Sequence, residues 1–153
     1  MQNVVLNCAL FPLLSMVLIS CQSVRPANLG THDGKLGPCP SSPNCVSSQS
    51  SDDAHRISPL TYSGPAADAM KKLTVVIQTF PRTSVITVSE SYLHAEFTSA
   101  IFRFVDDLEF LVDDTAKVIH VRSASRMGYS DLGVNRKRVE EIRLQWLAPH
   151  LSP

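Results

Sequence analysis

The sequence predicts an α+β fold: a four-stranded antiparallel meander with two helices packed on one face, preceded by a loop-rich N-terminal arm. Two segments have apolar residues at helical spacing, one on each side of a block of β-branched and alternating residues. Short connections within that block favour antiparallel neighbours. The region before residue 60 is rich in Ser, Pro, Asn and Gly, which is typical of loops.

The N-terminal segment predicts export and a lipid anchor. An apolar run that begins near Val4 ends in Leu18-Ile19-Ser20-Cys21, which resembles the lipobox of bacterial lipoprotein signal peptides. In that family the chain is cut before the cysteine, so residues 1–20 are a predicted signal peptide and Cys21 a lipidated (palmitate-bearing) N-terminus. The residue after the cysteine is Gln22. Aspartate at this position resembles an inner-membrane retention signal, so glutamine favours the outer membrane. We therefore expect a lipid-anchored protein of the bacterial envelope that faces the periplasm.

Two alternatives to a cleaved signal remain open. A secretory signal opens with positively charged residues, whereas Met1-Gln2-Asn3 carries only the terminal amine. An uncleaved transmembrane helix is one alternative, although the 17 residues from Val4 to Ser20 fall short of the roughly 20 that a span needs. A cytosolic chain with a different start is the other.

Cysteine usage agrees with export. Once Cys8 leaves with the signal and Cys21 is lipidated, Cys39 and Cys45 remain as an even pair. They lie in Pro38-Cys39-Pro40-Ser41-Ser42-Pro43-Asn44-Cys45, a turn-rich loop in a predicted oxidising compartment. We predict a disulfide that fixes the loop and contributes about 2 kcal/mol in the chain-entropy model.

Metal binding and redox chemistry are the alternatives for this cysteine pair. A metal site would need His32 or His55, because structural zinc takes four ligands and Cys-x5-Cys is not a usual zinc spacing. A redox-active pair has the motif Cys-x-x-Cys. We predict no metal site and no cofactor.

Residues 21–59 are predicted to form the tether and the Cys-containing arm, and residues 60–153 the α+β domain. A first helix is predicted from Pro65, which suits a first-turn position, to about Phe80. A last helix should run from Ser130 or Asn135 to Leu147. The apolar stripes of the two helices are Ala69, Leu73, Val76 and Phe80, and Val139, Ile142 and Trp146.

Four segments between the helices predict strands, because their residues are β-branched or alternate in polarity. They are Thr83–Glu90, Leu93–Phe102, Arg103–Asp113 and Lys117–Arg126, with a hairpin turn at Asp113-Asp114-Thr115. Asp106-Asp107 interrupts the third segment, which indicates a bulge or a buried, paired carboxylate.

The face of the predicted sheet that the helices leave uncovered is polar. We expect a solvated face with cross-strand ion pairs, and the alternative is an open ligand surface. The residues of this face are His94, Glu96, Arg103, Asp107, Glu109, His120 and Arg122.

The densest polar stretch runs from Arg122 to Arg138, out of the last strand and into the last helix. Hydroxyl and guanidinium groups next to free N–H groups at a helix N-terminus suit an oxyanion. The predicted ligand-binding residues are Arg103, Arg122, Ser123, Ser125, Arg126, Tyr129, Ser130, Asp131, Asn135 and Arg136.

A structural network is the alternative interpretation of this stretch. Ser130 or Asp131 would then be a plain N-cap. Ser123 and Ser125, if buried, would need hydrogen-bond partners. The ion pairs of such a network would join Arg122 and Arg126 to Asp106, Asp107 and Glu109.

Three segments, in this order, resemble the domain-of-unknown-function 1499 family. They are Pro38-Cys39-Pro40-Ser41-Ser42-Pro43-Asn44-Cys45-Val46-Ser47-Ser48, Ile101-Phe102-Arg103-Phe104-Val105-Asp106-Asp107-Leu108-Glu109-Phe110, and Arg122-Ser123-Ala124-Ser125-Arg126 with Gly128-Tyr129-Ser130-Asp131-Leu132-Gly133-Val134-Asn135-Arg136. The similarity covers about residues 36–147. It implies a small exported or membrane-associated domain, and no activity. It also implies that the two cysteines and most of the polar residues above belong to a shared pattern.

Three classes of function remain. The net charge of zero argues against nucleic-acid binding. The first class is a binding module for a small anionic ligand or a protein partner, held at the membrane by the lipid on Cys21. The second is a structural envelope-interaction protein with a buried polar network and no ligand. The third is an enzyme, but no motif places a base beside a nucleophile, so no catalytic residue is predicted. The residues that an enzyme would draw on are His94, His120, Ser123 and Asp131.

Overall fold

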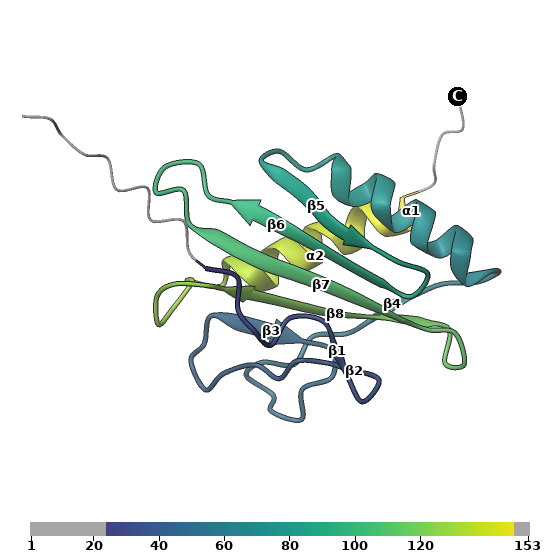
Figure 1. Ribbon diagram of the computed structural model, residues 1–153, viewed down its shortest axis with the longest axis horizontal. Helices are drawn as coiled ribbons and strands as arrows, with labels where there is room; N and C mark the ends of the chain where they lie inside the picture. The colour runs from purple at the N-terminus through teal and green to yellow at the C-terminus, as the bar shows by residue number, and fades with distance from the viewer. Residues whose placement is uncertain (1–23, 149–153) are drawn as a thin grey trace, which may run out of the picture.

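The sheet at the centre of the structure, a computed structural model that describes residues 24–148, contains six antiparallel strands. Two helices cover one face and the N-terminal arm lies on the other (Figure 1). The α+β class with both helices on one face is therefore confirmed, but the prediction of four strands is wrong. The predicted signal peptide and Cys21 lie outside the described residues.

The elements follow the predicted order once the arm has been passed. In the arm and its exit they are β1 (Thr31–His32), β2 (Lys35–Leu36), β3 (Cys45–Ser47) and β4 (Leu60–Thr61). In the rest of the chain they are α1 (Ala66–Gln78), β5 (Thr83–Val88), β6 (Tyr92–Thr98), β7 (Val105–Asp113), β8 (Val118–Ser125) and α2 (Val134–Leu147).

The two additional strands of the sheet, β3 and β4, both pair with β8. Cys45 lies opposite Ala124, and Leu60 lies opposite Ile119. In a four-stranded meander β8 would be an edge strand with unpaired N–H and C=O groups. The arm supplies those partners with strands of only three and two residues, which are too short to leave an alternating pattern in the sequence.

The meander from β5 to β8 has a regular register at the two acidic residues of β7. Asp106 lies opposite Phe97 and Ser125, and Asp107 lies opposite Glu96 and Ala124. Because no register shift occurs there, the interrupted alternation reflects buried carboxylates and not a bulge. The register shift of the sheet lies in β5, between Val85 and Thr87.

The connection between β6 and β7 is longer than predicted. β6 ends at Thr98 instead of Phe102, and β7 begins at Val105. The loop closes on itself, because Ser99 N–H donates to the carbonyl of Phe104 at 2.8 Å and Phe104 N–H donates to Ser99 Oγ at 2.9 Å. Arg103 has a φ of 58°, which a strand does not allow.

The core lies between the helices and the sheet. Its helical residues include Leu73 and Val76 of α1 and Val139 and Ile142 of α2, as the predicted stripes require. Ile77 of α1 is also buried, although it was not part of the predicted stripe. α2 begins at Val134, directly after Gly133, whose φ of 81° suits glycine. None of the helices in the described chain is long and apolar enough to cross a bilayer.

The arm is fixed to the sheet by a disulfide and by β3. Cys39 and Cys45 are joined, as predicted, with Cα atoms 5.6 Å apart, so their use as metal ligands or as free thiols does not apply here. β2 contacts β7 and β8 on the face opposite the helices. The expectation of a solvated or open polar face is therefore wrong, because the arm covers it.

Candidate functional site

Paired charges fill the space between the sheet and the arm. We call this cluster the arm-side network, and its members are Arg25, Tyr92, His94, Glu96, Asp107, Glu109, Arg122 and Arg126. Alternate residues of neighbouring strands point to the same face, which brings the side chains of β6, β7 and β8 together. The side chains of His94, Asp107, Glu109, Arg122 and Arg126 are at least nine-tenths buried.

Arg126 lies at the centre of the arm-side network. Its Nε donates to Asp107 Oδ2 at 2.8 Å, and its Nη2 donates to Asp107 Oδ1 at 2.6 Å and to Glu96 Oε1 at 2.5 Å. His94 Nε2 lies 2.8 Å from Asp107 Oδ1. Arg25 of the arm donates through Nε to Glu96 Oε1 at 2.6 Å. The arginine therefore joins three strands, and Glu96 connects it to the start of the arm.

A second ion pair, between Glu109 and Arg122, lies next to the first. Arg122 Nη1 donates to Glu109 Oε2 at 2.9 Å. Glu109 Oε1 accepts hydrogen bonds from the Tyr92 hydroxyl at 2.8 Å and from the N–H of Gly30 at 2.7 Å. Both oxygens of this fully buried carboxylate are thus bonded, and one of the donors is the arm backbone.

The pKa shifts of Asp107, Glu96 and Tyr92 follow from their partners in the arm-side network. Burial raises the pKa of Asp107, but hydrogen bonds from Arg126 and His94 outweigh it and hold the pKa below the usual 3.8. At Glu96 burial is likewise outweighed, by hydrogen bonds from Arg25 and Arg126, and the pKa lies below 4.5. Burial and the charge of Glu109 raise the pKa of Tyr92, so its hydroxyl remains a donor.

Three side chains of the arm-side network are arranged like the ligands of a metal site. His94, Glu96 and Asp107 offer ligand atoms that all lie within 4.8 Å of one another. Arg126 donates to the carboxylates of Glu96 and Asp107. Its guanidinium group therefore compensates the negative charge that a metal cation would otherwise compensate. We therefore assign the group to ion pairing.

A second set of hydrogen bonds lies on the opposite face of the sheet, beneath α2. We call it the helix-side network, and its members are Asn44, Asp106, Ser123, Ser125, Asp131, Asn135 and Arg138. The fully buried Asn135 is its centre. Asn135 Nδ2, which carries two hydrogens, lies within hydrogen-bond distance of three acceptors: the Asn44 carbonyl at 3.1 Å, Ser125 Oγ at 2.9 Å and Asp131 Oδ2 at 2.8 Å. Ser123 Oγ and Arg138 Nη1 donate to Asn135 Oδ1.

Comparison with known proteins places the chain in a family. The sequence profile of the family described as "Protein of unknown function (DUF1499)" matches residues 35–146, which is most of the chain. The chain belongs to this family. A comparison with curated proteins gives no match.

The ten predicted ligand-binding residues of this DUF1499 domain do not form one site. Arg122 and Arg126 lie in the arm-side network, whereas Ser123, Ser125, Asp131 and Asn135 lie in the helix-side network. Asp131 binds the N–H groups of Gly133 and Asn135, and so fixes the start of α2. The remaining four residues lie outside both networks: Arg103, Tyr129, Ser130 and Arg136.

The partners that the arm supplies were not predicted from the sequence. The pairs of Arg126 with Asp107 and of Arg122 with Glu109 were among the predicted alternatives, but Asp106 pairs with Arg138 of α2 at 2.6 Å. The contribution of Asn44 has no signal in the sequence, because it depends on how the arm returns to β8. The residues considered for an enzyme are likewise dispersed, since His94 and Ser123 lie on opposite faces of the sheet.

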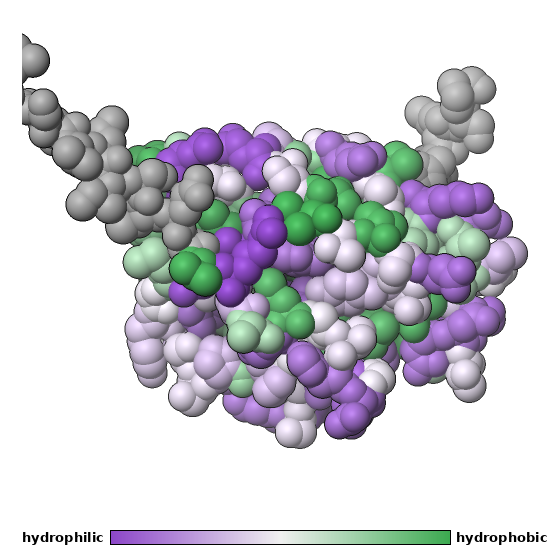
Figure 2. Space-filling view, viewed as in Figure 1, coloured by the Kyte–Doolittle hydropathy of each residue, from purple (hydrophilic) through white to green (hydrophobic). Residues whose placement is uncertain are grey.

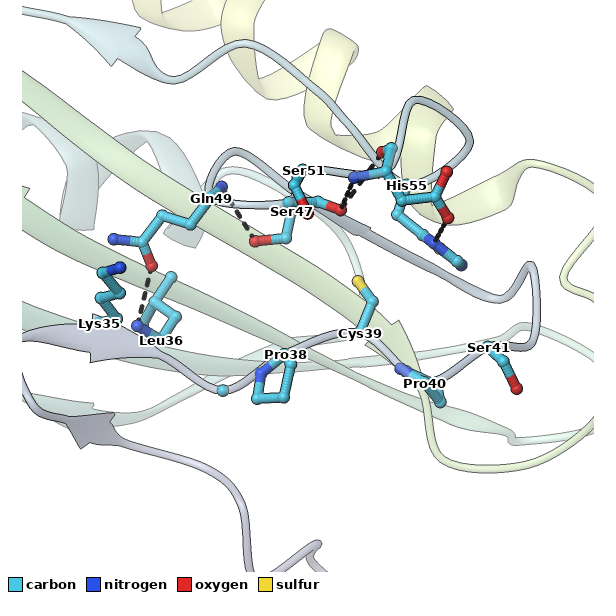
Figure 3. A pocket seen from close by; sticks show the side chains of 13 residues that line it. Lys35, Leu36, Pro38, Cys39, Pro40, Ser41, Ser47, Gln49, Ser51 and His55 are labelled. Carbon is cyan, nitrogen blue, oxygen red and sulfur yellow. Dashed lines mark hydrogen bonds and ion pairs between the residues drawn. The ribbon is translucent and has the colours of Figure 1, made fainter.

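Two cavities adjoin the disulfide. One of about 540 Å³ is lined by Lys35, Cys39, Ser47, Gln49 and His55, among others, and Figure 3 shows the Pro38–Ser41 segment facing Ser47, Ser51 and His55 across it. The other, of about 310 Å³, is lined by Pro38, Cys39, Asp107, Arg122 and Arg126, among others. Among the buried side chains of residues 24–148, the one nitrogen or oxygen atom without a hydrogen-bond partner is Arg122 Nε.

Proposed function

We propose that the chain is a lipid-anchored protein of the bacterial envelope, in which the DUF1499 domain is a rigid interaction module stabilised by buried polar networks. The charge balance of the arm-side network carries this proposal. Three guanidinium groups, those of Arg25, Arg122 and Arg126, face three carboxylates, those of Glu96, Asp107 and Glu109. Five of these six side chains are at least four-fifths buried, and Arg25 is partly exposed. Charges that neutralise one another in this way are engaged in structural ion pairs.

The proposed envelope location is supported by two features of the chain. One is the lipobox-like sequence that ends at Cys21. The other is the disulfide between Cys39 and Cys45, which suits an oxidising compartment. Mass spectrometry of the protein extracted from membranes tests this part. We expect a chain that begins at Cys21, carries acyl groups and lacks two hydrogens, whereas an unprocessed chain with free thiols would exclude the location.

Two measurements on the same variants test the structural role of the networks. One is the free energy of unfolding, and the other is the loss of a bound small molecule. Arg122→Ala leaves the buried Glu109 without its ion-pair partner, so we expect it to lower the free energy of unfolding by about 3–5 kcal/mol. A variant that keeps its stability but loses a bound small molecule in native mass spectrometry would support a ligand site instead.

Binding of a small anion is the second candidate function. It is favoured by the unpartnered Nε of Arg122 and by the 310 Å³ cavity that Arg122 and Arg126 both line. A carboxylate or phosphate group would suit such a position. Native mass spectrometry of the extracted protein tests this candidate, since a bound anion would add mass that disappears on denaturation.

A further inference from the structure

Large apolar side chains are exposed in two loops, residues 99–104 between β6 and β7 and residues 126–133 between β8 and α2. Ile101, Phe102 and Leu132 expose 82%, 72% and 94% of their surface. A soluble domain rarely leaves so many large apolar residues together in water. The exposed set consists of Ile101, Phe102, Phe104, Met127, Tyr129 and Leu132, and we call it the apolar end.

The first loop enters β7 where the second loop leaves β8, and β7 and β8 are neighbours, so both loops lie at the same end of the sheet (Figure 1). The N–H of Arg126 donates to the carbonyl of Val105 at 3.2 Å, so one loop starts where the other ends. Within the first loop, the rings of Phe102 and Phe104 stack with centroids 5.5 Å apart. The two loops that carry the six residues thus lie together at one end of the molecule.

The described chain begins at this same end (Figure 1). Arg25 is bonded to Glu96, which lies two residues before the end of β6. Val24 is itself exposed, and hydrophobic residues lie beside the start of the described chain in Figure 2. Only Gln22 and Ser23 separate Val24 from Cys21. Covalent geometry therefore limits the distance from the Val24 Cα to the Cys21 Cα to about 11 Å.

Charge differs between the two ends of the sheet. Arg103 and Arg82 are exposed at the apolar end, where Arg82 Nε donates to the carbonyl of Thr98. The turns at the opposite end carry Glu90, Asp113 and Asp114, although Lys117 pairs with Asp114 there. Asp131 adds one carboxylate to the apolar end, and it is bonded to the N–H groups of Gly133 and Asn135. The exposed arginines therefore give the first end the stronger attraction to an anionic lipid surface.

We propose that the apolar end is a membrane-docking surface, in which Ile101, Phe102 and Leu132 enter the headgroup region of the bilayer and Arg82 and Arg103 contact anionic headgroups. Aromatic side chains favour this interfacial region. The inference rests on the lipid anchor at Cys21, because the anchor brings this end of the domain to the bilayer. It goes further, because an anchor alone would leave the domain free to turn away from the lipid.

Quenching of tryptophan by brominated lipids tests the docking surface. The full chain, recovered from membranes, is reconstituted into vesicles that contain anionic phospholipid with or without brominated acyl chains. Phe102→Trp places a reporter at the apolar end, and Val88→Trp places one at an exposed position near the opposite end. Trp146, the single tryptophan of the sequence, is buried and gives both variants the same background.

We expect the brominated chains to quench the reporter of the Phe102→Trp variant and to leave the fluorescence of the Val88→Trp variant unchanged. Neutral vesicles should reduce the quenching, because they lack the anionic headgroups that Arg82 and Arg103 contact. Equal quenching of the two variants, or no quenching of the Phe102→Trp variant, would overturn the docking surface.

Co-sedimentation with the vesicles measures attachment to the bilayer, whereas quenching measures contact of the apolar end with the lipid. If the Phe102→Trp variant sediments without being quenched, the anchor holds and the docking surface is excluded. If mass spectrometry shows no acyl group on the chain but the Phe102→Trp reporter is quenched, the anchor is excluded and the docking surface is supported. A variant that neither sediments nor is quenched excludes both.

Discussion

Arg126 and Asp107 form a two-point ion pair across the β7–β8 pairing, with Nε 2.8 Å from Oδ2 and Nη2 2.6 Å from Oδ1. The two residues do not lie directly opposite in the register, since Asp107 faces Ala124. The long arginine side chain reaches back over the strand to the carboxylate, where the arm covers both groups. This geometry satisfies the fork of donors that arginine offers and both oxygens of the carboxylate.

Removal of the Arg126 side chain should lower the stability of the domain. In Arg126→Ala, Asp107 remains buried and keeps its hydrogen bond with His94. We expect the free energy of unfolding to fall by about 3–5 kcal/mol, because the variant leaves a buried charge uncompensated. Urea denaturation of the purified chain, followed by the fluorescence of Trp146, measures the change.

Lys71→Ala is the matched control for the loss of one positive charge. Lys71 is exposed on α1 and lies 3.6 Å from Asp68, and an exposed pair of this kind contributes about 0.2–1 kcal/mol. Equal stabilities of the Arg126 and Lys71 variants would contradict the structural role of the arm-side network.

The contrast between Ile101 and Leu108 shows how far the sequence predicts the fold. Both lie in segments predicted to be strands, and Leu108 is fully buried in β7 whereas Ile101 is exposed in a loop. Helices and strand order follow from periodicity, because burial against α1 and α2 imposes it on the sequence. Where the loop at Ile101 exposes apolar residues, the same pattern no longer reports a strand.

The arm explains what the sequence could not predict of the candidate site. His94 and Glu109 occupy a face whose alternation is typical of solvent exposure, yet both are buried. Whether such a face meets water depends on where a distant segment returns, and Gly30 is 79 positions away from the carboxylate that it binds. The charge pairs were open to prediction from residue type, but the burial that determines their energy was not.

The bonds of the helix-side network predict that the side-chain amide of Asn135 contributes strongly to the free energy of unfolding. Asn135→Ala removes the donor to the Asn44 carbonyl and the acceptor of Ser123 Oγ. Because buried polar atoms without partners cost about 1–3 kcal/mol each, we expect a loss of about 2–3 kcal/mol. Thermal and urea unfolding measure it.

Gln145→Ala on the same helix is the control for that variant. Gln145 is exposed, and its amide oxygen accepts a hydrogen bond from Thr79 Oγ1 at 2.7 Å. Its loss should change the free energy of unfolding by about 0.5 kcal/mol at most. A similar small effect of Asn135→Ala would show that the network does not stabilise α2 against the arm.

The disulfide should contribute a modest part of the stability. Cys39 and Cys45 are six positions apart, and closure of so short a loop contributes about 2 kcal/mol in the chain-entropy model. We expect the double variant Cys39→Ala/Cys45→Ala to fold and to lose about that amount in urea denaturation. A reducing agent should destabilise the wild type and leave the double variant unchanged, and an effect on both would point to another target.

The ionised state of Asp107 predicts a pH dependence of stability. Its pKa in the folded domain lies below the usual 3.8, because hydrogen bonds from Arg126 and His94 outweigh the effect of burial. The stabilisation is therefore complete above about pH 3.8 and is lost as the pH falls through the lower, folded value. Asp107→Asn cannot titrate, so it isolates this contribution from that of other groups.

We expect Asp107→Asn to be less stable than the wild type by about 2 kcal/mol at neutral pH, because a hydrogen bond to a charged group contributes about 1.5–3 kcal/mol. The difference between the two proteins should stay constant down to about pH 4 and shrink below it, since the wild-type carboxyl is then protonated as well. Unfolding curves at several pH values measure that difference directly. If it kept the same size well below pH 3.8, the stabilisation would not come from the charge of Asp107.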